Sequence, residues 1–331
     1  MRQPLRFLAL PLFAALWLAV SAAGLVQPAF AEVYPSRPIT LIVPFPPGGS
    51  TTVMARNVAD KMSAALGQSI VVENRGGAGG TLGTRYVAKA TPDGYTILLS
   101  YTSTFAIAPS AYANPGYDAR KDFAPIGMIG AAPNLLLVNP SVPAHSLTEL
   151  IAYIKAQSSP MQYGSPGVGT VNHLAGEMLA NELGVYMQHI PYKGNGPALG
   201  DLIGGHISMM FMPIPAALGN VKAGTLRAVA ISSAQRSKVL PDLPTLAESG
   251  LPNFEVALRY GLAAPAGTPQ PIIERLNKEL NAALADPEVQ MRLANEGADA
   301  LPMSPEAYTA DLDREEKKWG ALVRKLNLKL E

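Results

Sequence analysis

Short apolar runs alternate with longer segments of helical periodicity along most of the chain. Ile39–Val43 and Ile70–Glu73 are typical of buried strands, and the apolar residues between them recur at helical spacing until Gly67. Gly67 is predicted to end that helix in the left-handed conformation, which glycine adopts without strain. The other predicted strands are Tyr95–Leu99, Asn134–Val138, Gln162–Gly164, His206–Met212, Leu226–Ile231 and a segment near Val256–Leu262.

Helix starts are marked by short polar residues. Ser146 and Glu149 form a capping box, in which each side chain satisfies a free backbone N–H of the first turn. Thr268, Asp286 and Ser304 each precede a proline, and this pairing predicts an N-cap followed by the first helical residue. Strands that alternate with such helices predict an α/β fold with mostly parallel sheets flanked by helices.

The length of the chain favours two domains. It has 331 residues, and single hydrophobic cores stop growing at about 250–300 residues. Two stretches rich in proline and glycine, Pro125–Pro133 and Pro241–Pro252, are predicted to be the crossings between domains. The first domain is therefore predicted to comprise residues 32–132 and 253–331, and the second domain residues 133–252.

The first 31 residues have the pattern of a signal peptide. Arg2 and Arg6 precede the apolar run Phe7–Val20, which is shorter than the ~20 residues that a membrane-spanning helix needs. Ala29 and Ala31 then give a small-x-small cleavage pattern. We expect cleavage after Ala31 and export to the periplasm, with a retained membrane anchor as the alternative.

Composition excludes several classes of site. Basic and acidic residues nearly balance, with 26 of the first and 25 of the second, so a nucleic-acid partner is not expected. The chain has no cysteine, which removes disulfides, thiol nucleophiles and a lipoprotein anchor. Its four histidines lack metal-ligand spacing, and we predict neither a metal nor another cofactor.

Three loops rich in glycine each follow a predicted strand and precede a predicted helix. In Pro44–Thr52, two glycines and three hydroxyl residues lie where unpaired helix N–H groups can hold an anion. A tight turn with an N-cap is the alternative. Asn74–Gly80 fails the dinucleotide pattern because Leu82 replaces its third glycine, but it still fits ligand binding by backbone amides.

The third loop, Tyr163–Thr170, leads to His173 near the start of the next helix. His173 either orients a ligand or packs against the loop. A hydrolase motif around Ser165 would need glycine in place of Tyr163, so the nucleophile pattern is not met. Loops of this kind in both halves of the chain predict a small anion, a carboxylate rather than a nucleotide, held between two domains.

Six motifs resemble the Bug family, the extracytoplasmic solute receptors of tripartite tricarboxylate transporters. They occur in matching order along the chain: Pro44–Thr51, Glu73–Gly80, Thr91–Tyr95, Tyr163–Ser165, His189–Gly194 and Ala264–Pro269. The resemblance implies a two-domain Venus-flytrap fold, a small carboxylate ligand, membrane transporter subunits as partners and a monomer. The ligand residues that it implies are Gly49, Ser50, Thr51, Ala78 and Gly79 on one side, and Ser165, Gly169, Thr170 and His173 on the other.

Departures from the family pattern bear on specificity. Thr52 and Met212 stand where family members often carry aspartate, and neither can pair with an amino group, so amino acids become poorer candidates. Arg259 replaces the family's usual tryptophan and either binds a second carboxylate or faces solvent. Phe45 and Tyr101, with Met212, are expected to form apolar walls suited to an aliphatic or aromatic dicarboxylate.

We therefore expect a periplasmic binding protein that captures a carboxylate and delivers it to a tripartite transporter, without catalysis. The alternative is a receptor of the same fold that signals ligand availability to a membrane sensor kinase. A third hypothesis is an enzyme, a periplasmic hydrolase that uses Ser50 or Ser165 with a nearby histidine. The sequence gives this hypothesis little support.

Overall fold

The computed structural model describes residues 34–330. The elements described below belong to one unit that begins at Arg37. The predicted signal peptide and its cleavage site lie outside the described residues.

Ten strands are joined in one hydrogen-bonded sheet. At one end, β1 (Ile39–Val43) pairs in parallel with β2 (Ile70–Asn74) and β3 (Thr96–Tyr101). At the other end, β5 (Gln162–Ser165) pairs in parallel with β6 and β7. The remaining strands are β4 (Phe123–Val138), β6 (Gln188–Pro191), β7 (Met209–Pro213), β8 (Arg227–Ile231), β9 (Ala257–Pro265) and β10 (Asp299–Ala300).

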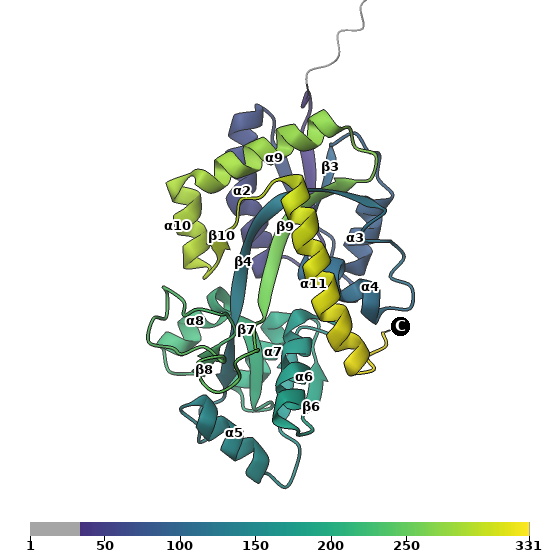
Figure 1. The fold of residues 1–331 in the computed structure, drawn as a ribbon. Coiled ribbons are helices and arrows are strands. Elements are labelled where there is room, and N and C mark those ends of the chain that lie inside the picture. Colours follow the sequence, from purple (N-terminus) through teal and green to yellow (C-terminus); the bar gives the residue numbers. More distant parts are fainter. Residues whose placement is uncertain (1–33, 331) are drawn as a thin grey trace, which may run out of the picture. The chain divides into compact units, whose positions relative to one another are not determined.

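The long strands β4 and β9 join the two parallel groups and make antiparallel pairs. Figure 1 shows them side by side between the two groups. Residues 123–133 of β4 pair with β9, and residues 134–138 pair with β7 and β8. Parallel pairing is therefore confined to the two ends of the sheet, and the mostly parallel arrangement predicted from the sequence is replaced by a mixed one.

Pro125–Pro133, predicted as a crossing between domains because it is rich in proline and glycine, is not an irregular loop but part of β4. Its register against β9 shifts between Pro125 and Gly127 and again between Met128 and Gly130. Proline is tolerated in a strand at such irregular positions. Gly130 also allows a close approach, because a Cβ there would lie 2.4 Å from the carbonyl oxygen of Asp299.

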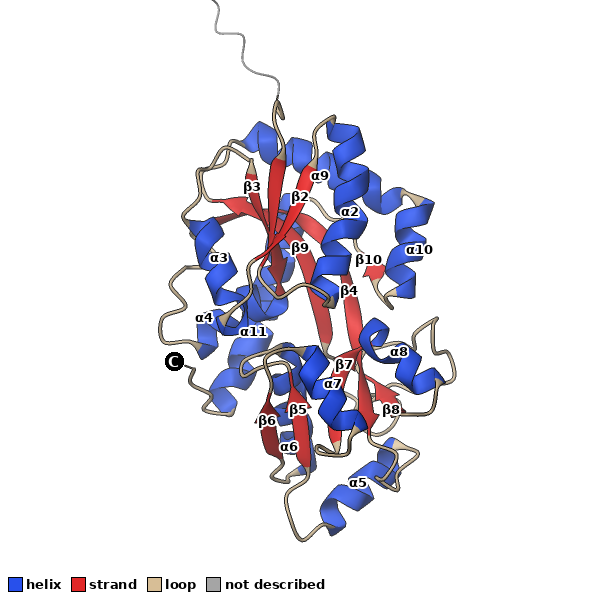
Figure 2. Ribbon diagram, turned by 180° about the vertical axis from the view of Figure 1, so that it is seen from behind, coloured by secondary structure: helices blue, strands red, loops and turns tan. Residues whose placement is uncertain are grey.

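Helices lie on both faces of the sheet (Figure 2). Gly67 ends the first of them with a φ of 70°, which confirms the predicted left-handed cap. Ser146, Asp286 and Ser304 each accept a backbone N–H bond at a helix start, as predicted. The helices are α2 (Ser50–Leu66), η1 (Ala78–Gly80), α3 (Thr81–Ala88), η2 (Ser103–Ile107), α4 (Ala108–Ala111), α5 (Leu147–Ala156), α6 (Val171–Leu183), α7 (Asn195–Ile203), α8 (Ile214–Lys222), α9 (Gln270–Ala285), α10 (Pro287–Asn295) and α11 (Pro305–Lys325).

Thr268 does not cap α9, contrary to the prediction. The helix begins at Gln270, and its N-cap position is Pro269. The hydroxyl of Thr268 instead donates 2.7 Å to the carbonyl oxygen of Pro265, at the end of β9. The side chain therefore closes the turn before the helix.

Two buried hydrophobic clusters lie along the sheet. One contains Ile42, Leu98 and Met128 and extends to Tyr308 of α11. The other packs the second half of β4 against β7, β8, α7 and α8. The division into domains at residues 133 and 252 stays a prediction. Within residues 34–330, no helix has the length and apolar character needed to cross a membrane.

Gly261 of β9 leaves room for the ring of Tyr308, and this contact is open to test. A Cβ at Gly261 would lie 2.2 Å from the Tyr308 hydroxyl oxygen, which is 2.8 Å from Ser100 Oγ. We expect Gly261→Ala to lower the free energy of unfolding by about 1–3 kcal/mol through overpacking. Thermal melting of the variant measures the loss.

The matched control is Gly219→Ala in α8, where no atom lies within 4 Å of the added Cβ. A helix-interior alanine should leave stability unchanged or raise it by up to about 1 kcal/mol. Equal melting temperatures for both variants would contradict the close contact at Tyr308.

Candidate ligand-binding site

The loop between β1 and α2 presents backbone N–H groups at a helix start. Gly48 has a φ of 88°, and Gly49 is the N-cap residue in an extended conformation. No side chain caps this helix, and its first turn contains no acidic residue. The partial positive charge of a helix N-terminus is therefore available to an anion at Gly49 and the residues that follow it.

Two hydroxyl residues of this loop make internal hydrogen bonds. Asn74, at the end of β2, donates its side-chain amide to Phe45 O at 2.9 Å and to Thr52 Oγ1 at 2.8 Å. Ser50 Oγ lies 3.0 Å from the hydroxyl of Tyr260 on β9. Asn74 thus fixes the loop through hydrogen bonds to Phe45 and Thr52. The third hydroxyl residue, Thr51, is buried.

The second glycine loop has an unusual run of positive φ angles. These are 139° at Gly77, 48° at Ala78, 63° at Gly79 and 97° at Gly80. Turns of this kind can direct backbone N–H groups to one side and hold an anion, and here the N–H groups of Ala78 and Gly79 are the candidates, because that of Gly80 donates to Gly77 O. The helix that follows, α3, also begins without a side-chain cap. The loop packs on the first one, since a Cβ at Gly76 would lie 2.7 Å from Pro46.

Aromatic rings line the same region. The ring of Phe45 meets that of Tyr101 edge to face at 5.1 Å, and Tyr101 lies 5.3 Å from Tyr260 between ring centres. A Cβ at Gly80 would be only 2.9 Å from Phe45 Cζ. The structure therefore brings together Phe45 and Tyr101, as the sequence predicted, and adds Tyr260.

The third loop, between β5 and α6, is held by its own hydroxyls. Ser165 is fully buried, and its Oγ donates to Gly167 O at 2.9 Å. Thr170 Oγ1 donates to the same carbonyl at 2.8 Å and accepts from the N–H of His173 as the N-cap of α6. These two side chains therefore shape the loop. Gly169 is buried and its N–H is bound to His173, so the exposed backbone at Val168 is the part left to meet a ligand.

The second and third loops approach one another. A Cβ at Gly79 would lie 3.8 Å from Val168 O and 3.0 Å from the hydroxyl of Tyr112. A Cβ at Gly169 would lie 2.3 Å from Leu330 Cδ1 and 3.8 Å from the Tyr112 ring. Tyr112 and Leu330 thus lie between the two loops. Neither was predicted, and no local pattern in the sequence marks them.

His173 lies beneath the third loop. Its side chain is buried, its Nδ1 accepts from Gly169 N at 3.2 Å, and its ring stacks on His189 with 3.9 Å between centres. Of the two possibilities open at the sequence level, the structure shows His173 in contact with the loop from within.

Met212 does not form the apolar wall of the ligand site that the sequence predicted. Its side chain is fully buried in the cluster formed with Leu135, Leu202 and Ile214. Side chains alternate along a strand, and this position of β7 points into the packed layer between the strands and the helices α7 and α8. Met212 therefore contributes to the core and does not face the three loops.

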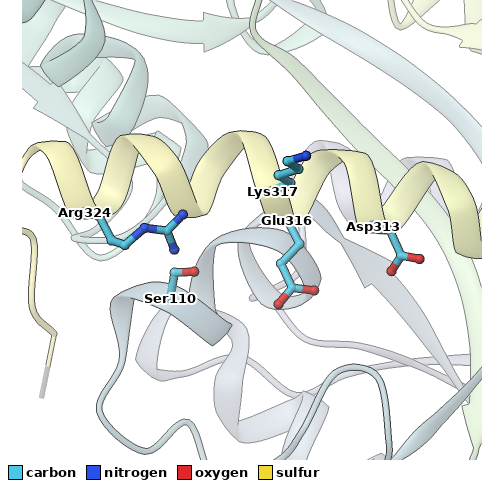
Figure 3. Close-up of a pocket in the computed structure, with 5 residues that line it drawn as sticks. All are labelled: Ser110, Asp313, Glu316, Lys317 and Arg324. Atoms are coloured by element: carbon cyan, nitrogen blue, oxygen red, sulfur yellow. The ribbon is translucent and has the colours of Figure 1, made fainter.

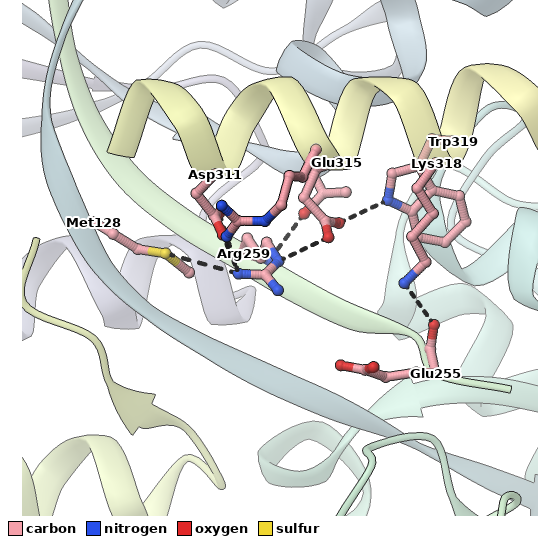
Figure 4. A network of polar contacts seen from close by, with 9 residues as sticks. Met128, Glu255, Arg259, Asp311, Glu315, Lys318 and Trp319 are labelled. Carbon is pink, nitrogen blue, oxygen red and sulfur yellow. Dashed lines mark hydrogen bonds and ion pairs between the residues drawn. The ribbon is translucent and has the colours of Figure 1, made fainter. Parts of the chain in front are cut away.

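The predicted role of Arg259 in ligand binding is also wrong, because its guanidinium is bound by α11 (Figure 4). Nη1 donates to both carboxylate oxygens of Asp311 at 3.1 Å, and Nε lies 3.2 Å from Glu315. The guanidinium is therefore neither bound to a ligand carboxylate nor free in solvent, because Nη1 is shared between the two oxygens of Asp311. Glu315 in turn accepts from Trp319 Nε1 at 3.0 Å, which completes the network.

A cavity of about 250 Å³ lies between α4 and α11 (Figure 3), and none of its lining residues belongs to the three loops. It is lined by Ser110, Asp313, Glu316, Lys317 and Arg324. Among residues 34–330, no group of three or more acidic or histidine side chains is arranged to hold a metal ion.

Comparison with known proteins identifies the class. Solved periplasmic binding proteins share this fold. The sequence profile of the tripartite tricarboxylate transporter family receptor matches residues 54–328, and the chain belongs to this family. Its members are solute-binding receptors and not enzymes. The Bug-family resemblance of the six sequence motifs is thereby confirmed.

Three proteins illustrate the similarity. Protein BugT of Bordetella pertussis is 39% identical over 320 residues, which are 96% of this chain and 98% of BugT. Rpa4515 of R. palustris, solved with adipate, is 34% identical with a TM-score of 0.85, covering 89% of this chain and 99% of that one. MatC of Rhodopseudomonas palustris, solved with malate, is 34% identical with a TM-score of 0.81, covering 88% and 100%.

The position of Arg259 predicts a loss of stability when it is replaced. In Arg259→Met, Asp311 keeps only Arg314 as a partner while its side chain stays 2% exposed. Leaving a buried charge with weakened pairing should cost roughly 2–4 kcal/mol, and thermal melting measures it.

Ligand-induced stabilisation should remain the same in Arg259→Met as in the parent protein. The double variant Arg259→Met with Asp311→Asn should recover part of the loss, because it removes the weakly paired carboxylate charge. If Arg259→Met were as stable as the parent protein but bound the ligand more weakly, Arg259 would belong to the ligand site.

Proposed function

We propose that the protein binds a small dicarboxylate at its three glycine-rich loops and delivers it to the membrane subunits of a tripartite transporter. The loops after β1 and β2 supply the N–H groups for one carboxylate, around Gly49, Ser50, Ala78 and Gly79. The loop at Gly169 approaches from the other parallel group of strands. The observation that carries the proposal is the adjacency of an uncapped helix start and a run of positive φ angles.

An anion is favoured at these loops for an electrostatic reason. Backbone N–H groups at a helix start carry a partial positive charge and need a partner when they are removed from water. A carboxylate satisfies several of them at once through charge-assisted hydrogen bonds. With Arg259 bound to Asp311, we infer that neutral donors hold both ends of the ligand.

The middle of the ligand is proposed to be apolar. The rings of Phe45 and Tyr101 pack edge to face beside the loops, which suits methylene groups or an aromatic ring between two carboxylates. Relatives of the same family have been solved with adipate and with malate, both of them dicarboxylates. These two ligands support a dicarboxylate as the class of ligand, and the individual compound is to be identified by titration.

Calorimetric titration of the mature protein with a panel of carboxylates tests the proposal. The panel should contain aliphatic dicarboxylates of four to eight carbons, aromatic dicarboxylates, citrate and neutral amino acids. A ligand at about 100 times its Kd should stabilise the fold by ~2.7 kcal/mol, which thermal melting detects independently. Binding of amino acids alone, or of no carboxylate, would contradict the proposed function.

The loop itself is tested by Ser50→Ala. Removing a hydroxyl that donates to a carboxylate should cost about 1.5–3 kcal/mol of binding free energy, which raises Kd about tenfold or more. Titration with the best ligand of the panel measures the change. Ser249→Ala is the matched control, because that hydroxyl donates to Thr245 O in a segment remote from the loops. Equal affinities for the two variants would place the ligand elsewhere.

A further inference from the structure

Two stacked histidines hold the third loop at both of its ends. His173 lies on α6 and His189 on β6, and their ring centres are 3.9 Å apart with an interplanar angle of 30°. His173 contacts the loop at Gly169, and His189 contacts it at Ser165.

The hydrogen bonds define the protonation state of His173. Gly169 N donates to Nδ1 at 3.2 Å, so Nδ1 carries no proton. The proton of the neutral ring is then on Nε2, which lies 3.8 Å from the carboxylate of Glu177. This tautomer follows from the donors and acceptors around the ring. A second proton, on Nδ1, would oppose the N–H of Gly169.

The hydrogen bonds around Ser165 likewise define which ring nitrogen of His189 carries the proton. Ser165 Oγ donates to Gly167 O at 2.9 Å and accepts from Gly167 N at 3.2 Å. The remaining acceptor site of Oγ faces His189 Nε2 at 2.7 Å. His189 Nε2 is therefore the donor, and Ser165 Oγ makes three contacts, so it is not a free nucleophile.

The surroundings keep both rings neutral. Tyr163 on β5 stacks on His189 at 5.0 Å and donates its hydroxyl to Glu177 at 2.5 Å, so this carboxylate already has a partner. Tyr186 adds a further titratable hydroxyl near Tyr163. Burial lowers the pKa of His189 to about 4, and burial together with the charge on His189 lowers the pKa of His173 to about 3.

We propose that the His173–His189 pair positions the third loop for carboxylate binding, His173 by accepting from Gly169 N–H and His189 by donating to Ser165 Oγ. The inference rests on the proposed function, because it assigns the pair to the same ligand site. The two histidines are positioning residues: they fix the backbone at Gly169 without touching the ligand.

The direction of the pH dependence follows from these depressed pKa values. In the unfolded chain an imidazole takes up its proton near pH 6.5, whereas the folded protein keeps both rings neutral well below that pH. The stability that the pair contributes is therefore complete above pH 6.5. It is lost as the pH falls from 6.5 through the folded pKa values of about 4 for His189 and about 3 for His173, and protonation of His173 breaks its hydrogen bond with Gly169 N.

Variants that separate hydrogen bonding from packing test the proposal. His173→Phe and His189→Phe keep a ring in the stack but remove the hydrogen bond. His173→Asn keeps an acceptor near the Nδ1 position, and His189→Gln keeps a donor near the Nε2 position. We expect Kd for the best dicarboxylate to rise about tenfold in both phenylalanine variants and to stay within about threefold in His173→Asn and His189→Gln. The exposed His206→Asn is the control.

A purely structural role would give the opposite order. The phenylalanine variants would then keep their affinity, while the smaller Asn or Gln side chains would lose affinity, and this order of Kd values overturns the proposal. All titrations are made at a temperature at which circular dichroism shows each variant to be folded.

Nuclear magnetic resonance of the wild-type protein tests the protonation states of the two histidines without a variant or a ligand. Ring nitrogen shifts at pH 5.5 should show both histidines neutral with the proton on Nε2, where an unperturbed imidazole is mostly charged. Titration of His173 near pH 6.5, or a proton on its Nδ1, overturns the proposal. A wild-type protein with the expected tautomers that binds no carboxylate would overturn the proposed function and its ligand role, while the hydrogen bonds to the loop would stand.

Discussion

The antiparallel pairing of β4 with β9 is the constraint on which the arrangement of the loops depends. These two strands carry the sheet from one parallel group to the other, so the loops after β1, β2 and β5 can meet. α11 reinforces the crossing from outside. It binds Arg259 of β9 through Asp311, and its Lys318 donates to Glu255 O just before that strand begins. A fixed crossing gives the loop residues a defined geometry before any ligand arrives.

Several charged side chains bind one another within the fold, whereas the candidate ligand site is built mainly from neutral groups. Arg259 binds carboxylates of α11, and Arg75 pairs with Glu73 while it covers the ring of Tyr86. The loops offer N–H groups, hydroxyls and aromatic rings instead. Preorganised dipoles can stabilise an anion without carrying the desolvation cost of a buried cation. Affinity at such a site depends on how firmly the backbone is held.

Side chains that bind the loops from within fix the backbone that forms the candidate site. Asn74 fixes the first loop to β2, and the two stacked histidines fix the third loop to α6 and β6. Tyr112 and Leu330 lie between the second and third loops. In the proposed site these contacts act on the ligand indirectly, through the position of the loop backbone.

The sequence by itself determined the features that depend on neighbouring residues. Gly67, Ser146 and Ser304 act at helix ends as predicted, because a cap involves only a few adjacent positions. The three glycine loops also follow their strands, and the family motifs pointed to the receptor class. Tertiary structure alone decided which distant groups meet. Arg259 and Asp311 are 52 positions apart, and Ser165 and His189 are 24 apart. Met212 and the strand over Pro125–Pro133 were misread for the same reason: burial and pairing depend on the partners that the fold supplies, and no local pattern specifies them.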